Sequence, residues 1–333
     1  MPIKSREIHL KSRPVGLPSP DNFALVDVTL PDPQPGQVLV RNHFMSVDPY
    51  MRGRMYDRPS YVPPFPLGAP LEGGSVGEVV ASRHPDFSPG EMVLSRLGWR
   101  EYFLSDGSGL TKIDTRLVPP QAYLGVMGMP GMTAYVGLLD IGKPQPGQTV
   151  FVSAAAGAVG QVACQIAKLK GCRVIGSAGS PSKVQWLLEV AGIDAAFNYK
   201  TVPSLVDELG RLAPEGIDIY FENVGGAHLE AALEHMKPFG RIVLCGMISQ
   251  YNAPSPGPRN LVHAVRKRLL LQGFIVSDHL ERQAPFHADM AAWIREGKVK
   301  WEETIVEGLE KAPQAFIGLF HGENLGKMLV KLV

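Results

Sequence analysis

The chain has 333 residues, of which 45% are hydrophobic and 20% are charged. This is the composition of an ordinary folded protein, so it excludes a disordered chain, and the length favours two domains. Lys and Arg number 33 against 32 Asp and Glu, and the longest basic run is residues 266–268, so the charge pattern excludes a broad surface for nucleic acid or anionic membranes and favours small-molecule partners.

The first part of the chain, residues 1 to about 120, is rich in Pro and Gly. It contains short apolar or alternating runs such as 37–41 and 77–81, and a Pro-Gly turn precedes the strand-like run at 38–41. This pattern predicts a small β-rich domain with many turns.

From about Ala122 the pattern changes to helix-length stretches that alternate with short apolar strands. The expected strands are 149–155, 173–177, 217–223 and 241–246. Strands separated by helix-length segments predict βαβ units with a parallel sheet, so the expected fold class is α/β. The end of the chain, "ENLGKMLVKLV", is typical of one more strand, which we expect to return to the first domain. The expected domains are therefore 1–121 with 299–333, and 122–298.

The stretch Ser153–Gly171, "SAAAGAVGQVACQIAKLKG", predicts a strand-to-helix turn that binds a dinucleotide. Its apolar residues recur at the spacing of one helix face. Ala155, Gly157 and Gly160 occupy the three positions of G-x-G-x-x-G, with alanine in the first. The second glycine lets the backbone approach a pyrophosphate, and the third lets the helix pack closely on the strand. The alternative, an alanine-rich core helix with incidental glycines, explains the flanking strands less well.

The end of the second expected strand indicates which dinucleotide is bound. An NAD site usually carries an acid about 20 residues after the loop, whereas Gly176–Lys183 contains no acid and one lysine. A small neutral pocket near a cation suits the 2′-phosphate of NADP, so we expect NADP(H) as the cofactor. In that case loss of Lys183 weakens NADPH binding about 10- to 100-fold. The alternative is that Lys183 is a solvated residue in the first turn of a helix, where a cation is slightly unfavourable.

Six segments carry a resemblance to a known family. They are "VDPYMRGRM" (47–55), "AAAGAVGQVACQIAKLKGCRVIGSAGS" (154–180), "FENVGG" (221–226), "CGMISQYN" (245–252), "QGFIV" (272–276) and "GENLGKMLV" (322–330). With these segments the chain resembles the medium-chain dehydrogenase/reductase superfamily, and within it the zinc-independent branch of prostaglandin reductases, plant double-bond reductases and bacterial curcumin reductases. The resemblance implies a doubly wound Rossmann domain and a GroES-like β-rich domain completed by the C-terminal segment. It also implies NADPH-dependent reduction of the C=C double bond of α,β-unsaturated ketones and aldehydes.

The same resemblance implies a cofactor site at particular positions. The loop expected at the pyrophosphate consists of Gly157, Ala158, Val159 and Gly160. Lys183 and Tyr199 are expected to hold the adenosine 2′-phosphate, and Ser177 and Gly179 belong to the small neutral segment already expected to bind the cofactor. The residues expected on the nicotinamide side are Asn223, Cys245, Gly246, Met247, Ile248, Phe274, Ile275 and Val276. Asn324 would reach the cofactor from the C-terminal segment, or would be a turn former between its neighbours.

No metal site is expected. Where a zinc alcohol dehydrogenase places its first catalytic cysteine, this chain has the neighbourhood of Ser46, and "LGAPLEGGSVGEV" (67–79) contains no histidine in place of the Gly-His-Glu. Catalytic zinc needs three protein ligands and an open position. The three cysteines, Cys164, Cys172 and Cys245, are scattered and form no Cys-x-x-Cys pair, so we interpret them as small apolar side chains in a reduced core.

Without a metal, hydrogen bonds must polarise the carbonyl of an enone while hydride adds to its β-carbon. A tyrosine hydroxyl is a suitable donor and a possible source of the proton. Tyr251 is the leading candidate because it follows "CGMISQ" and opens the Pro-rich loop 251–260; alternatively, it packs that loop. Tyr50 and Tyr56 are further candidates, although for Tyr50 a structural turn locked by an Asp48–Arg52 pair is the favoured interpretation.

Two other functions are compatible with this sequence. One is NADPH-dependent quinone reduction, because quinones also present a conjugated carbonyl. The other is a non-catalytic NADPH-binding protein, as in the crystallins of the superfamily, which would keep Gly157, Gly160 and Lys183 but tolerate a blocked substrate pocket.

Location and assembly are also expectations of the sequence. Met1–Glu7 lacks the apolar core of a signal peptide, and no apolar run approaches the roughly 20 residues that cross a bilayer, so we expect a cytoplasmic protein without a membrane partner. The apolar run in 268–278 is typical of a strand at a sheet edge, and because exposed edges invite pairing we expect a homodimer.

Overall fold

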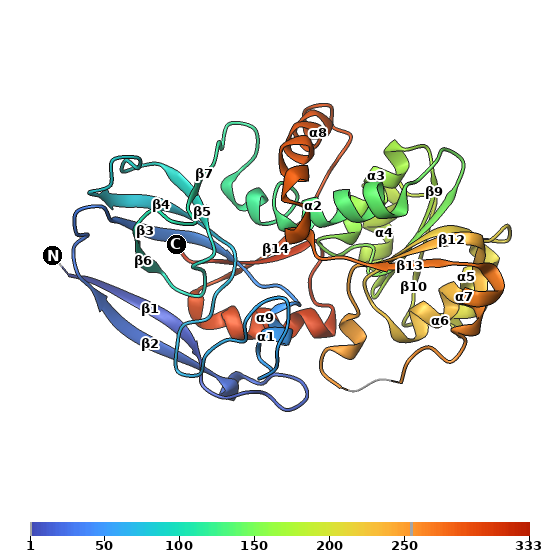
Figure 1. Ribbon diagram of the computed structural model, residues 1–333, viewed down its shortest axis with the longest axis horizontal. Coiled ribbons are helices and arrows are strands. Elements are labelled where there is room, and N and C mark those ends of the chain that lie inside the picture. The colour runs from blue at the N-terminus through green and yellow to red at the C-terminus, as the bar shows by residue number, and fades with distance from the viewer. Residues whose placement is uncertain (1, 254–255) are drawn as a thin grey trace. The chain divides into compact units, whose positions relative to one another are not determined.

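The computed structural model describes residues 2–253 and 256–333 (Figure 1). The chain divides into two compact units, of which the first comprises Met1–Leu124 with Glu303–Val333 and the second comprises Gly125–Glu302. The expected α/β fold class is confirmed, because the second unit contains a parallel sheet and the first is rich in β-strands. In the part of the chain that the structure describes, no helix has the length and apolarity that a membrane span requires.

The first unit contains a seven-stranded sheet among its described residues, and the C-terminal end of the chain completes it. The strand order is β14-β15-β3-β4-β5-β7, and β6 also pairs with β3. Strand β15 runs antiparallel to β3, with Leu329 opposite Ser46, and parallel to β14. The strands are β3 (Val38–Ser46), β4 (Ser75–Ser82), β5 (Met92–Ser95), β6 (Tyr102–Ser105), β7 (Thr111–Lys112), β14 (Glu303–Glu307) and β15 (Lys327–Lys331). A separate antiparallel pair consists of β1 (Ile3–Leu10) and β2 (Phe23–Leu30).

Aromatic side chains form the centre of the first unit's core. Trp99 is fully buried and stacks on Phe23 of β2, with ring centroids 6.0 Å apart. Phe316 meets Trp99 edge to face at 6.2 Å and comes from α9 (Ala312–His321), a helix of the C-terminal segment. The C-terminal segment therefore contributes to the core of this unit as well as to its sheet.

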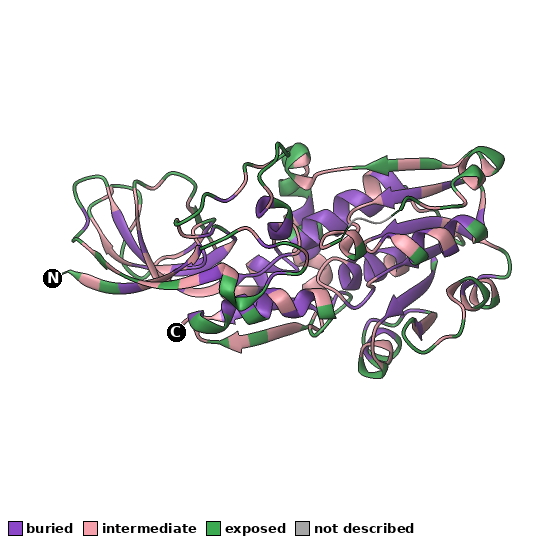
Figure 2. Ribbon diagram, turned by 90° about the horizontal axis from the view of Figure 1, so that it is seen from below, coloured by how far each residue is buried: buried purple, intermediate pink, exposed green. Residues whose placement is uncertain are grey.

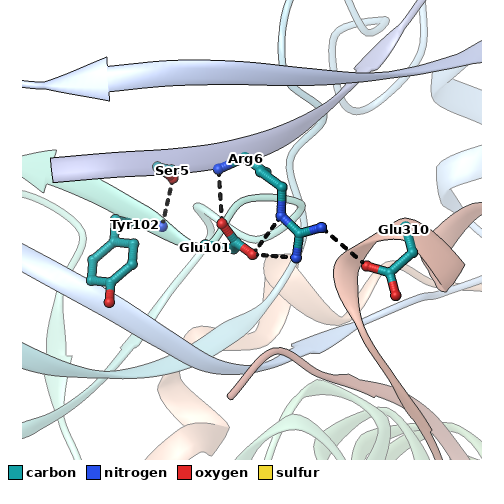
Figure 3. Close-up of polar contacts among 5 residues, drawn as sticks. All are labelled: Ser5, Arg6, Glu101, Tyr102 and Glu310. Atoms are coloured by element: carbon teal, nitrogen blue, oxygen red, sulfur yellow. Dashed lines mark hydrogen bonds and ion pairs between the residues drawn. The ribbon is translucent and has the colours of Figure 1, made fainter.

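An arginine clamp also ties β1 to later parts of the first unit (Figure 3). Arg6 donates to Glu101 Oε1 from Nε at 2.8 Å and from Nη2 at 2.6 Å. Its Nη1 donates to Glu310 Oε2 at 3.4 Å, in the 3₁₀ turn η6 (Leu309–Lys311), and beside the clamp the Tyr102 N–H donates to Ser5 Oγ at 3.1 Å. Because these hydrogen bonds join β1 to residues far along the chain, they hold β1 beside the segments that contain Glu101 and Glu310.

The second unit is built on a six-stranded parallel sheet within the described residues, so the expected parallel sheet is confirmed. Its order is β10-β9-β8-β11-β12-β13. The strands are β8 (Thr149–Val152), β9 (Arg173–Ala178), β10 (Ala195–Asn198), β11 (Ile217–Glu222), β12 (Met236–Leu244) and β13 (Leu270–Gly273). Strand β8 ends before the expected 155 and β12 begins before the expected 241.

Helices alternate with these strands, and buried residues concentrate on the strands and on the helix faces that pack against them (Figure 2). Ser180 caps α4 by accepting a bond from the Lys183 N–H at 3.3 Å, with Pro181 at the first helical position. The α-helices are α2 (Met129–Val136), α3 (Gly160–Leu169), α4 (Pro181–Glu189), α5 (Leu205–Leu212), α6 (Gly226–His235), α7 (Val262–Lys267) and α8 (Gln283–Arg295), with α1 (Met51–Arg54) in the first unit. The shorter or irregular turns are η1 (Pro20–Asn22), η2 (Pro120–Leu124), η3 (Gly137–Gly142), η4 (Ile248–Gln250) and η5 (Val276–Arg282).

Candidate cofactor-binding site

The loops at the carboxyl ends of the parallel strands carry the predicted cofactor residues of the second unit. Strands β9 and β10 lie on one side of β8, and β11, β12 and β13 lie on the other. The direction in which the sheet is wound therefore reverses between β8 and β11. In open α/β sheets, ligands bind at the carboxyl edge at such a reversal.

The loop after β8 begins helix α3 and contains the predicted glycines. A Cβ on Gly160 would lie 2.3 Å from Ala154 O and 2.8 Å from Ala155 Cα, so only glycine permits this contact of helix and loop. A Cβ on Gly157 would meet only Ala154 O, at 3.1 Å, which leaves the other side of the loop open. Ala158 and Val159 follow at the N-terminus of α3, where the first N–H groups of a helix have no partner within the helix and are available to an anion.

The end of β9 brings together Ser177, Gly179, Lys183 and Tyr199. A Cβ on Gly179 would lie 3.1 Å from Tyr199 Cε1 and 3.2 Å from its hydroxyl, so the bare backbone of Gly179 faces the ring. Burial lowers the pKa of Lys183, and the charge of Lys200 lowers it further. Ser177 differs from the others because it is fully buried, and its Oγ has no hydrogen-bond partner among the described residues.

The predicted nicotinamide-side residues gather after β11, β12 and β13. Asn223 Nδ2 donates to Ser153 O at 2.8 Å, which holds its side chain over the end of β8. Cys245, Gly246 and Met247 share one hollow of about 420 Å³ with Phe274 and Ile275. Ile248 and Val276 begin the short turns η4 and η5 that follow these segments.

A buried carboxylate beside these residues was missed by the sequence analysis. Glu222 ends β11 and is fully buried. Its Oε1 accepts bonds from Ser153 Oγ at 3.0 Å, from the Val224 N–H at 2.6 Å and from the Gly225 N–H at 2.9 Å. Burial raises the pKa of Glu222. An acid inside the apolar run "IDIYFE" was the signal that could have revealed it.

The leading proton-donor candidate, Tyr251, lies against the segment that lines this hollow. The Met247 N–H donates to the Tyr251 hydroxyl at 3.4 Å, and a Cβ on Gly246 would lie 3.1 Å from that hydroxyl. The turn η4 returns the chain so that the ring faces the residues before it. Residues 254 and 255 of the Pro-rich loop lie outside the described residues.

Three of the predicted residues, Tyr50, Tyr56 and Asn324, belong to the first unit. Tyr50 precedes α1, and burial raises its pKa well above the ordinary value, with a smaller contribution from the charge of Asp48. The Tyr56 ring has the guanidinium carbon of Arg52 at 4.0 Å and that of Arg58 at 4.6 Å. Asn324 Nδ2 donates to Gly326 O at 2.7 Å, which is the bond of a turn former.

The expected Asp48–Arg52 pair is wrong. Asp48 accepts a bond from Ser46 Oγ and forms its salt bridge with Lys327. Arg52 Nη2 instead donates to Pro14 O at 3.3 Å and to Gly16 O at 2.8 Å. The Arg52 guanidinium thus binds carbonyl oxygens of the loop before η1, while Asp48 pairs with Lys327 of the C-terminal strand.

The cysteines and histidines give no ligand set for a metal. Over residues 2–253 and 256–333, no three His, Cys, Asp or Glu side chains gather as a metal site would require. Cys164 and Cys172 are buried free thiols, and burial raises the pKa of the Cys245 thiol to about 12. A raised pKa opposes formation of the thiolate that binds zinc.

Two family models match parts of this chain. Residues 6–113 match the family described as the N-terminal domain of oxidoreductase, and residues 158–295 match the family described as zinc-binding dehydrogenase. The zinc in the second description has no matching ligand set among the described residues.

Relatives match over almost the whole chain. NADPH-dependent curcumin reductase of Escherichia coli (strain K12) is 45% identical, covering 99% of this chain and 97% of that protein. The NADP(+)-dependent 2-alkenal reductase of Nicotiana tabacum is 44% identical, covering 98% and 97%. The crystal structure of CurA from Vibrio vulnificus in complex with NADPH is 46% identical, with a TM-score of 0.94, and covers 98% of this chain and 99% of that one. The resemblance found in the sequence is thus confirmed, and the chain belongs to the medium-chain dehydrogenase/reductase family of oxidoreductases that includes the curcumin and 2-alkenal reductases.

Proposed function

We propose that this protein is an NADPH-dependent, zinc-independent reductase of the C=C double bond of α,β-unsaturated ketones and aldehydes. The observation that carries the proposal is the identity of 44–45% along the whole chain with relatives named for curcumin and for 2-alkenals. Both kinds of compound have a double bond conjugated to a carbonyl. Two substrates that share only this feature favour the conjugated carbonyl as the group that is recognised.

The carboxyl edge of the parallel sheet offers the groups that this cofactor needs. Ala158 and Val159 would present backbone N–H groups to the pyrophosphate. Gly157, whose own N–H donates to Ala154 O at 2.9 Å, would let the pyrophosphate approach the loop, and Gly160 would keep α3 close to it. Lys183 and the Tyr199 hydroxyl would bind the 2′-phosphate, because no acid occurs in Gly176–Lys183 to repel it.

The hollow after β12 and β13 would receive the nicotinamide, and bound NADPH would supply the hydride that adds to the β-carbon. Asn223 is held by its bond to Ser153 O, so its position does not depend on the ligand. The Phe274 ring packs against the bare backbone of Gly137, since a Cβ on Gly137 would lie 2.7 Å from the ring. This contact fixes the side of the hollow that Phe274 lines. This side would give the nicotinamide ring an apolar surface to pack against.

The charge that develops on the substrate carbonyl oxygen needs a hydrogen-bond donor, for which we propose Tyr251. Its hydroxyl accepts a bond from the Met247 N–H and lies beside Gly246, within the segment that lines the hollow. From this position the hydroxyl would stabilise the oxygen and would protonate the substrate directly or through water. Tyr50, with its raised pKa, and Tyr56 remain the alternative donors, and Asn324 remains a proposed contact of the cofactor.

The initial rate of NADPH oxidation with a medium-chain 2-alkenal tests the function. NADH, a saturated aldehyde and a quinone are the parallel controls, and the product is identified by chromatography. We expect consumption of NADPH with the alkenal and formation of the saturated aldehyde. Faster turnover of the quinone would replace the proposal with quinone reduction, and tight NADPH binding without turnover of any substrate would favour the non-catalytic alternative.

Assembly and location are further parts of the proposal. Strand β13 is at the edge of the six-stranded sheet, and the exposed side chains near it include Leu270 on the strand and Val265 on α7. An edge with unpaired backbone groups and exposed apolar side chains supports a homodimer that pairs these edges. Light scattering during gel filtration, with Leu270→Asp as the disrupting variant, measures the association. The free thiols support a reducing compartment such as the cytoplasm, which cell fractionation tests.

A further inference from the structure

A second lysine lies beside the residues assigned to the 2′-phosphate. Lys200 follows Tyr199 directly after β10, and its N–H donates to Asn198 Oδ1 at 3.1 Å. The Tyr199 N–H donates to Ala178 O at 3.0 Å, which ties this turn to the end of β9. The turn therefore holds Lys200 at the carboxyl edge of the sheet, next to Gly179.

Gly179 brings the side chain of Lys200 close to the end of β9. A Cβ on Gly179 would lie 3.3 Å from Lys200 Cε, almost as close as to the Tyr199 ring. The aliphatic part of Lys200 thus passes over the bare backbone of Gly179. The ammonium group is one bond beyond Cε, so it lies near Gly179 and the Tyr199 ring beside it.

The two lysines repel each other at this place. The charge of Lys200 disfavours the charged form of Lys183. Like charges held together raise the energy of the protein without a ligand. A ligand with two negative charges between them would relieve the repulsion.

We propose that Lys200 is a second cation for the 2′-phosphate of the cofactor and so a determinant of the preference for NADPH over NADH. The inference rests on the proposed use of NADPH. A phosphate monoester carries a charge of about −1.5 to −2 at pH 7, which one lysine balances only in part. Lys183 supplies the half-buried cation and Lys200 the exposed one.

The test measures binding of two adenosine nucleotides to the full chain by titration calorimetry. Adenosine 2′,5′-bisphosphate contains the 2′-phosphate, and adenosine 5′-monophosphate lacks it. Lys200→Met is the test variant, and Lys200→Arg keeps the charge. Lys170→Met is the matched control, because Lys170 is an exposed lysine of the same unit at the end of α3, at the opposite edge of the sheet.

We expect Lys200→Met to weaken binding of the bisphosphate about 5- to 20-fold, between the effect of an exposed ion pair and that of a charged hydrogen bond. Binding of the monophosphate should stay within about twofold, Lys200→Arg should restore most of the loss, and Lys170→Met should change neither affinity. Unchanged bisphosphate binding in Lys200→Met would identify Lys200 as a solvated side chain. Equal weakening of both nucleotides would indicate damage to the loop, and either result overturns the proposal.

The same titrations separate this inference from the proposed function. Wild-type protein that binds both nucleotides equally would contradict the use of NADPH and, with it, the assignment of Lys200. Wild-type protein that prefers the bisphosphate through Lys200 but reduces no enone would retain the inference and overturn the proposed reaction.

Discussion

Lys327 Nζ lies 3.2 Å from Asp48 Oδ1 in the core of the first unit, with both side chains almost fully buried. The same ammonium group donates to Val47 O and to Met328 O, each at 2.8 Å. Lys327 lies on β15 and Asp48 follows β3, so this pair fastens the C-terminal strand to the N-terminal part of the unit. Burial lowers the pKa of Lys327 and Asp48 opposes that shift, which is the behaviour of a buried charge that depends on its partner.

Replacement of Lys327 by Met should destabilise the protein by about 3–5 kcal/mol, because it leaves the Asp48 carboxylate buried without its cation. Urea unfolding followed by fluorescence measures the loss. The double variant with Asp48→Asn should recover part of it. Lys331→Met is the control, since Lys331 makes an exposed ion pair with Glu307 and should cost no more than about 1 kcal/mol. Equal losses of unfolding free energy in Lys327→Met and Lys331→Met would show that the buried pair stabilises the protein no more than the exposed one.

Patterns confined to short stretches predicted much of the fold. The glycine turn after β8 and the alternation of helices and strands depend on neighbouring residues, so the sequence was sufficient for them. The partner of Asp48 depends on which distant strands meet, and the nearest arginine along the chain was the wrong choice. The predicted end of the first parallel strand, residue 155, was also wrong. Ala154 adopts a positive φ of 46° and turns the chain soon after Val152, and a run of alanines gives no sign of such a turn.

Loss of the Glu222 carboxylate should disturb both stability and cofactor binding. Glu222→Ala removes the acceptor for the N–H groups of Val224 and Gly225 and for the Ser153 hydroxyl, so we expect a loss of about 2–3 kcal/mol of stability. The KM for NADPH should rise, because Asn223 is bound to Ser153 through both its N–H and its side chain. Glu222→Gln keeps one acceptor oxygen and should lose less.

Urea unfolding and NADPH titration of these variants provide the check. Glu215→Ala, at an exposed position of the same unit, should stay within about 0.5 kcal/mol of the wild type. If Glu222→Ala lowered stability without changing the KM for NADPH, the carboxylate would support the fold alone and would not position Asn223.

His228 should make the protein sensitive to acid. It is buried on α6 beside Tyr199, with ring centroids 5.0 Å apart, and burial lowers its pKa from 6.5 to about 4. The unfolded chain binds a proton below about pH 6.5, whereas the folded protein does so only near pH 4. The contribution is therefore fully present above pH 6.5 and is lost as the pH falls toward 4, by about 3 kcal/mol in total.

Unfolding free energies of the wild type and of His228→Leu between pH 7.5 and pH 4.5 isolate this contribution from that of the carboxylates. The difference between the two proteins should change in favour of the variant as the pH falls. His321→Leu, which removes an exposed imidazole, is the matched control. Parallel curves for His228→Leu and the wild type would contradict the assignment.

Removal of metal ions should leave the activity unchanged. The proposed reaction polarises the substrate carbonyl by hydrogen bonds and needs no metal, and among the described residues no three ligand side chains gather. Incubation with EDTA or 1,10-phenanthroline, followed by the NADPH oxidation assay, measures the effect, and a zinc alcohol dehydrogenase serves as the positive control. Activity that the chelators abolish and that zinc restores would require ligands that the described residues do not provide.

The local geometry of the candidate site could be predicted from the sequence where it depends on one short motif, as at Gly157 and Gly160. Lys200 escaped because it belongs to none of the recognised motifs. Glu222 escaped because its segment, "FENVGG", was interpreted only through Asn223. The contacts of Glu222 and the role proposed for Lys200 both depend on which strands lie beside them. Ser177 was expected near the 2′-phosphate, and its hydroxyl is fully buried, because the sequence pattern does not show which side chains of this segment face outward.

Substitution of Tyr251 by Phe tests the proposed proton donor. The variant loses only the hydroxyl, so we expect kcat with a 2-alkenal to fall about 100-fold while the affinity for NADPH stays the same. Steady-state rates and a fluorescence titration of NADPH measure the two quantities separately. Tyr123→Phe is the matched control, because the Tyr123 hydroxyl donates to Asp114 O in the first unit and should not affect kcat. An unchanged kcat in Tyr251→Phe would exclude Tyr251 and direct the same test to Tyr50 and Tyr56. A lower affinity for NADPH with unchanged kcat would instead mean that the ring only supports the Cys245–Met247 segment.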